Sequence, residues 1–68
     1  MKIRVNGEDY ETSQQTLSGL LEEMKVRSGR VAVEVNLKVI KRADTADYPI
    51  NEGDVIEVVN FVGGGDGR

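Results

Sequence analysis

Apolar and polar residues alternate over the first part of the chain, as they do in a strand with one buried side. Ile3 and Val5 share one side of this alternation, and polar residues occupy the other. Asn6 and Gly7 follow, and this pair favours a two-residue hairpin turn because both residues tolerate a positive φ. We therefore predict a hairpin whose second, short strand covers 10–12.

The next apolar residues recur with the period of an α-helix. The residues with this spacing are Leu17, Leu20, Leu21 and Met24. Thr16 is a suitable N-cap for such a helix. Gly19 lowers its intrinsic stability, which indicates either a close approach to the sheet or a weak first turn.

Alternation returns in the second half of the chain. Valine at every second position makes 31–36 the best candidate for a central strand. Residues 37–40 either continue this strand or form a neighbouring one. No period is visible over 41–50, where there is room for one helical turn before Pro49.

A last strand is predicted over 55–61, after a turn at 51–54 that contains glycine, asparagine and acidic residues. Its inward side is formed by Ile56 and Val58, and its outward side by Val55, Val59 and Phe61. Either a bulge turns Phe61 back into the core, or Val59 and Phe61 form an exposed apolar patch that a partner protein can bind.

The order of these elements predicts an α+β domain with one main helix across a mixed sheet of four to five strands. We assign the domain to 1–62 and a flexible glycine-rich tail to 63–68. Nine basic and 12 acidic residues give a net charge of −3, which argues against nucleic-acid binding. We also expect no signal peptide, no membrane span and a cytoplasmic location.

Side chains suited to catalysis are scarce in this sequence. Histidine and cysteine are absent, which removes the usual general base, the thiol nucleophile and most metal ligands. Three carboxylate pairs remain: Glu22 with Glu23, Asp44 with Asp47, and Glu52 with Asp54. Each pair is expected on a helix surface or in a turn, where charged side chains are solvated. The sequence therefore predicts no enzyme active site, no metal and no cofactor.

The run Gly63, Gly64, Gly65 has three interpretations. Two carry no function: an unpacked chain end, or a linker added by engineering. The third is a reactive arm, because glycines without Cβ pass through narrow channels and a terminal glycine carboxylate is sterically open. The arm would leave directly from the last strand, which would hold its base rigidly.

Several motifs together point to a known family. They are Val31-Ala32-Val33-Glu34-Val35-Asn36, Val39-Ile40-Lys41-Arg42, Glu52-Gly53-Asp54-Val55-Ile56-Glu57-Val58-Val59 and Phe61-Val62-Gly63-Gly64-Gly65. With them, the chain resembles the ThiS family of ubiquitin-like sulfur carriers over nearly its whole length. The Glu-Gly-Asp turn alone is a weak signal, whereas the combination is fairly specific.

The resemblance implies a β-grasp fold and a carrier that is not itself an enzyme. An E1-like enzyme would use ATP to adenylate the terminal glycine carboxylate, a desulfurase would supply sulfur for a thiocarboxylate, and thiazole synthase would receive that sulfur. By the same resemblance, Gly65 carries the thiocarboxylate, Gly63 and Gly64 thread the partners' channels, and Phe61 and Val62, beside Val59, contact the partners.

One departure from the family pattern lies at the end of the chain, where Asp66, Gly67 and Arg68 follow the glycines. A protease trims these three residues before activation, or they stem from engineering, or this copy carries no sulfur. We favour trimming because the Phe-Val-Gly-Gly-Gly run is intact. Two alternative functions stay open: a sulfur carrier for molybdopterin or for an amino acid, and a non-reactive β-grasp module that binds a protein.

Overall fold

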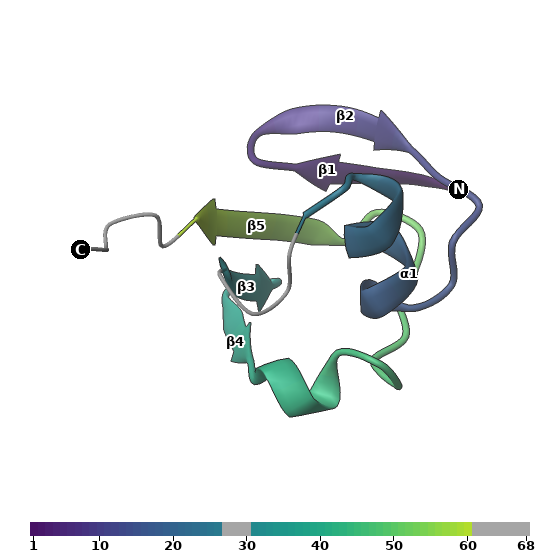
Figure 1. The fold of residues 1–68 in the computed structure, drawn as a ribbon. Coiled ribbons are helices and arrows are strands. Elements are labelled where there is room, and N and C mark those ends of the chain that lie inside the picture. Colours follow the sequence, from purple (N-terminus) through teal and green to yellow (C-terminus); the bar gives the residue numbers. More distant parts are fainter. Residues whose placement is uncertain (27–30, 61–68) are drawn as a thin grey trace.

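The structure is a computed structural model that describes residues 1–26 and 31–60. In these ranges the elements are β1 (Lys2–Val5), β2 (Glu8–Glu11), α1 (Leu17–Glu23), β3 (Val31–Val35), β4 (Lys38–Ile40), the 3₁₀ turn η2 (Arg42–Asp44) and β5 (Val55–Asn60). Figure 1 shows α1 lying against one side of the sheet that the strands form. The predicted α+β class and the predicted order of elements are confirmed.

The five strands form one mixed sheet in the order β2-β1-β5-β3-β4. β1 and β5 are parallel, and the other neighbours are antiparallel. β3 has a strand on either side, so the prediction that 31–36 is a central strand is confirmed, and the middle position of the sheet belongs to β5. A run of β-branched residues indicates a buried strand. It does not indicate which other strands pair with that strand, because strand order depends on distant parts of the chain.

The N-terminal hairpin has the predicted two-residue turn. Asn6 and Gly7 have φ values of 51° and 83°, and Val5 pairs directly with Glu8 across the turn. The second strand therefore begins at Glu8, two residues earlier than predicted, and ends before Thr12. β2 is an edge strand of mainly exposed residues, so it carries no apolar alternation that would have located it.

Helix α1 begins as predicted. Thr16 is its N-cap, and the Thr16 hydroxyl accepts a hydrogen bond of 3.1 Å from the Gly19 N–H. A Cβ on Gly19 would lie 2.5 Å from Gln14 Oε1 and 3.3 Å from Thr16 Oγ1. The close approach at this glycine is therefore to the segment before the helix and not to the sheet.

The segment 41–50 closes the N-terminal end of α1. Its backbone carbonyls at Thr45 and Tyr48 accept hydrogen bonds of 3.0 and 2.8 Å from the N–H groups of Ser18 and Leu17. The first N–H groups of a helix have no acceptor within the helix. This irregular segment supplies carbonyl acceptors for two of them. The predicted single helical turn in this segment is η2.

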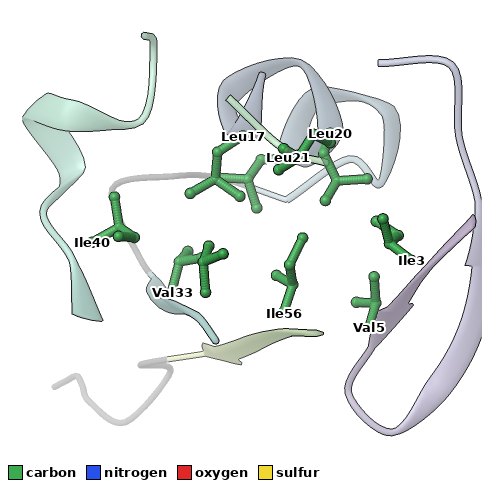
Figure 2. Packing of buried hydrophobic residues seen from close by; sticks show 10 residues of the cluster. Ile3, Val5, Leu17, Leu20, Leu21, Val33, Ile40 and Ile56 are labelled. Atoms are coloured by element: carbon green, nitrogen blue, oxygen red, sulfur yellow. The ribbon is translucent and has the colours of Figure 1, made fainter. Parts of the chain in front are cut away.

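The hydrophobic core lies between α1 and the sheet. Its buried members are Ile3, Val5, Leu17, Leu20, Leu21, Val33, Val35, Ile40, Ile50 and Ile56. Figure 2 shows the three leucines of α1 pointing toward the isoleucines and valines of the strands. The predicted inward sides of the helix and of 31–36 are confirmed, and Ile56 of β5 is fully buried.

Candidate functional site

Glu23, one of the carboxylates singled out in the sequence, joins β2 to the helix. Its Oε1 accepts a hydrogen bond of 2.7 Å from the buried Thr12 hydroxyl and one of 3.2 Å from the Tyr10 hydroxyl. Desolvation raises the pKa of Tyr10 above 10.0, and the negative charge of Glu23 and its hydrogen bond add to this effect. Glu23 therefore has a structural role.

The carboxylates of the 51–54 turn are also structural acceptors. Asp54 accepts hydrogen bonds from the Asn51 backbone N–H at 2.8 Å and from the Asn36 amide at 3.1 Å. Glu52 accepts one of 3.1 Å from the backbone N–H of Lys2. These bonds fix the turn that leads into β5.

The third pair, Asp44 and Asp47, is exposed at the surface of the 41–50 segment. Across residues 1–26 and 31–60, no three histidine, cysteine or acidic side chains are grouped to hold a metal ion. In the same ranges, no helix is long and apolar enough to cross a membrane.

The side of the sheet away from α1 is open. Strand residues alternate between its two sides, so those that flank the buried core positions of β3, β4 and β5 point outward. We call this surface the open face; its residues are Ala32, Glu34, Val39, Val55, Glu57 and Val59. Three of the four large apolar residues that are exposed in the described residues belong to it.

The exposed fractions on the open face are large for valine. Val39 is 65% exposed and Val59 is 55% exposed, whereas Val55 is 39% exposed. The predicted outward side of the last strand is thus confirmed for Val55 and Val59. Sequence reasoning missed Val39, although its place next to the core residue Ile40 was a usable signal.

The fourth exposed apolar residue, Leu37, lies in the turn between β3 and β4 and is 89% exposed. Asn36 and Leu37 have φ values of 53° and 72°, a region that costs a non-glycine residue about 1 kcal/mol or more. The side chain of Asn36 accepts a hydrogen bond of 3.0 Å from the Val55 N–H. The turn is therefore tied to the start of β5, and nothing in the fold requires leucine at its tip.

β5 is held as far as Asn60 on one edge and as far as Val58 on the other. On one side, β3 pairs with it as far as Asn60. On the other side, β1 pairs only with its start, and the side chain of Asn6 continues this edge by accepting a 2.8 Å hydrogen bond from the Val58 N–H. The strand that leads toward the glycine run is thus well anchored.

A shallow hollow of about 340 Å³ lies at the start of β5. Residues of β1 and of the 51–54 turn line it, among them Lys2 and Glu52. Its other cation, Arg4, is paired with Asp9 at 3.5 Å. The hollow adjoins Val55, at the opposite end of β5 from Asn60, so it is not placed to serve the end of the chain.

The predicted site residues in the glycine run and beside it lie outside the described residues. They are Phe61, Val62, Gly63, Gly64 and Gly65, together with Asp66, Gly67 and Arg68. Of the predicted partner contacts, the structure places Val59 on the open face near the end of β5.

The model of the ThiS family matches residues 3–65, from β1 to the third glycine of the run. The chain belongs to the ThiS family. Full-length relatives in this family are named sulfur carrier protein ThiS. The resemblance seen in the sequence is therefore confirmed.

Two kinds of relative are similar to this chain. The sulfur carrier protein ThiS of Thermus thermophilus is 39% identical over 63 residues, which are 93% of this chain and 98% of that protein. The thiazole synthases of Paramagnetospirillum magneticum and Magnetococcus marinus are 42% identical over 66 residues. This chain spans only 20% of the length of these two relatives.

A crystal structure of ThiS from Geobacter metallireducens has the same fold. It superimposes with a TM-score of 0.82 at 30% sequence identity, and the match covers 96% of this chain and 100% of that one. The β-grasp fold expected from the sequence is thereby confirmed.

Proposed function

We propose that this ThiS protein carries sulfur as a thiocarboxylate on Gly65. The observation that supports this most strongly is the extent of the family match, which includes the whole glycine run and stops at Gly65. The anchoring of β5 by β3 and Asn6 agrees with it, because a well-held strand gives the tail a fixed starting point.

The chemistry requires a good electrophile at the end of the tail. An E1-like partner joins the Gly65 carboxylate to the adenylyl group of ATP, and pyrophosphate leaves. The persulfide of a desulfurase then attacks the acyl carbon, and AMP leaves with its bonding electrons. A thiol next attacks the resulting acyl disulfide, so that a new disulfide forms and the thiocarboxylate is released. The product is a thiocarboxylate whose sulfur passes on to thiazole formation. The carrier supplies no acid or base of its own, in keeping with its lack of histidine and cysteine.

Thiazole synthase is the proposed acceptor of this sulfur. In the two relatives named thiazole synthase, the segment similar to this chain is part of the same polypeptide. Joining two proteins in one chain raises their effective concentration, which is useful when they meet in every turnover. We place the carrier and its partners in the cytoplasm.

The tail is the proposed moving part. Residues 1–62 form the β-grasp domain and 63–68 the tail, in which Gly63 and Gly64 thread the partners' channels. Val59, Phe61 and Val62 contact the partner at the base of the tail. The exposure of Val59 supports the first of these contacts.

Removal of Asp66, Gly67 and Arg68 is part of the proposal. Asp66 follows Gly65 in the sequence, so on this proposal a protease hydrolyses the peptide bond after Gly65 before adenylation. The intact mass of the protein from its native cells tests this step. A population that ends only at Arg68, with the activating enzyme present, would contradict trimming.

The decisive experiment incubates a version that ends at Gly65 with the activating enzyme, ATP and a sulfur source. The expected result is the replacement of one oxygen by sulfur in its mass spectrum. A version that ends at Gly64 and the full chain are matched controls and should remain unchanged. If the version ending at Gly65 is also inert, the carrier proposal for this residue fails.

A further inference from the structure

The last strand keeps only one neighbouring strand along the stretch that leads to the glycine run. β1 pairs with the start of β5, and its last partner there is Ile56. The chain then turns away at Asn6 into β2, whereas β5 continues as far as Asn60. Beyond Ile56, β3 is thus the only strand of the described residues that pairs with β5.

Asn6 extends the contact with β5 by one further step. Its backbone N–H donates a hydrogen bond of 2.9 Å to the carbonyl of Ile56, and its side-chain Oδ1 accepts one of 2.8 Å from the N–H of Val58. Ile56 and Val58 flank Glu57, as the two partners of one residue do in a parallel ladder. The side-chain carbonyl of Asn6 therefore takes the place of a backbone carbonyl, because the backbone turns away at this residue with a φ of 51°.

The hairpin turn itself does not require the side chain of Asn6. Glycine is also favoured at the first position of such a turn, since the requirement there is a positive φ. The Asn6 side chain instead accepts its hydrogen bond from Val58, which is 52 positions away along the chain. Asn6 thus meets two separate requirements, a positive φ for the hairpin and a hydrogen-bond acceptor for β5.

We propose that Asn6 is a positioning residue for the tail, because its hydrogen bond to Val58 fixes the direction in which β5 leads to the glycine run. The proposal rests on the proposed function, in which Gly65 carries the sulfur. Val58 is only seven residues before Gly65, so a change of direction at Val58 is passed along the chain to the reacting carboxylate. Without the bond, β5 would have more orientations at this point, and a partner's channel would accept only a fraction of them.

The bond also has a simpler explanation, which the test must separate from positioning. A hydrogen bond within a folded protein contributes to its stability whether or not it serves a reaction. On that explanation, removal of the bond would lower Tm but leave the activation of folded protein unchanged. On the positioning proposal, removal of the bond lowers activation even when every molecule is folded.

The test compares three substitutions in the version that ends at Gly65. Asn6→Gly keeps the positive φ and removes the acceptor. Asn6→Asp keeps both, since aspartate tolerates a positive φ and its side-chain oxygens accept hydrogen bonds. Thr16→Ala is the matched control, because it removes a side-chain acceptor of one backbone N–H in another element, the helix α1.

Hydrogen exchange in the free carrier tests the contact itself. The reference is the N–H of Leu20, which donates to the Thr16 carbonyl in α1. In Asn6→Gly, the exchange rate of the Val58 N–H relative to that of Leu20 should rise about tenfold, because the end of β5 opens locally. In Asn6→Asp this ratio should stay close to that of the parent. An unchanged ratio in Asn6→Gly would overturn the proposal.

The kinetics of sulfur loading test the consequence. They are measured by mass spectrometry with the activating enzyme, ATP and a sulfur source, at a temperature below the Tm of every variant. Asn6→Gly should raise the KM for the carrier about threefold to tenfold at a similar kcat, because only a fraction of its molecules presents the tail correctly. The KM values of Asn6→Asp and Thr16→Ala should stay within about twofold of the parent, because both keep the acceptor for Val58.

The outcomes separate this proposal from the function on which it rests. If the parent acquires sulfur and Asn6→Gly has the same KM, the positioning role is refuted and the carrier function stands. An equal rise in KM for Asn6→Gly and Thr16→Ala would also refute positioning, because the loss would then follow stability alone. So would a failure of Asn6→Asp to restore the KM of the parent. If the parent itself acquires no sulfur, the proposed function fails and the positioning role fails with it.

Discussion

The two sides of the sheet use the same kinds of residue for different purposes. On the side that α1 covers, Val33 and Ile56 are 3% and 0% exposed. On the open face, Val39 and Val59 are 65% and 55% exposed, although they belong to the same group of strands. Both pairs satisfy the strand preference for β-branched residues, but only the first pair is removed from water by folding.

The covered side of the sheet stabilises the fold, whereas the open face contributes little to stability. Burial of the covered side accounts for the core, because apolar surface removed from water stabilises the folded state. The open face gains nothing comparable from folding, and it also carries the opposed Glu34 and Glu57. Burial in the core therefore does not explain the composition of the open face.

The largest expected effect is on the covered side. Leu20 is fully buried in the middle of α1, so Leu20→Ala should lower the free energy of unfolding by about 2–5 kcal/mol through lost burial and a cavity. Urea denaturation measures this value. A cost of less than about 1 kcal/mol would show that α1 can close over the missing side chain and that the core is loosely packed.

The same substitution on the two sides tests the comparison directly. Val33→Thr introduces a hydroxyl group into the core and should cost about 1–3 kcal/mol. Val59→Thr changes an exposed side chain and should alter the free energy of unfolding by no more than about 0.5 kcal/mol. Urea denaturation of both variants and the parent measures the two changes in the free energy of unfolding. Equal changes for the two variants would refute the distinction between the two sides.

A smaller effect is expected at the start of α1. Thr16→Ala removes the acceptor of the Gly19 N–H and should cost about 1 kcal/mol. Thr16→Ser keeps the hydroxyl and serves as the control, with stability close to that of the parent. If both variants unfold at the same urea concentration, the hydrogen bonds that the 41–50 carbonyls accept are sufficient to hold the start of the helix without the Thr16 hydroxyl.

The smallest effect concerns pH at the junction of β2 and α1. The pKa of Tyr10 is raised above 10.0 in the folded state, first by desolvation and then by Glu23. The resulting stability is present below about pH 10 and is lost as pH rises through the folded-state pKa, because the unfolded chain then releases the proton more readily. Tyr10→Phe should show a weaker decline of Tm above pH 10. Identical profiles for the two proteins would exclude Tyr10 as the cause.

Local patterns predicted most of the fold. Thr16 and the leucine spacing located α1, and the Asn6-Gly7 pair located the first turn, because caps and positive-φ turns depend on a few neighbouring residues. The start of β2 at Glu8 was missed because an exposed edge strand needs no apolar period. The exposure of Val59 was foreseen from the alternation, whereas the pairing of Glu34 with Glu57 depends on register.

The sequence by itself determined most of the elements, the inward sides of β1, α1 and β3, and membership of the ThiS family, because these follow from local periods and motifs. Only the tertiary structure decided that β5 takes the middle of the sheet, between β1 and β3. That placement brings Glu57 beside Glu34 and leaves Val39 and Val59 on one open face. Strand order and register arise from contacts between distant parts of the chain, which no local pattern encodes.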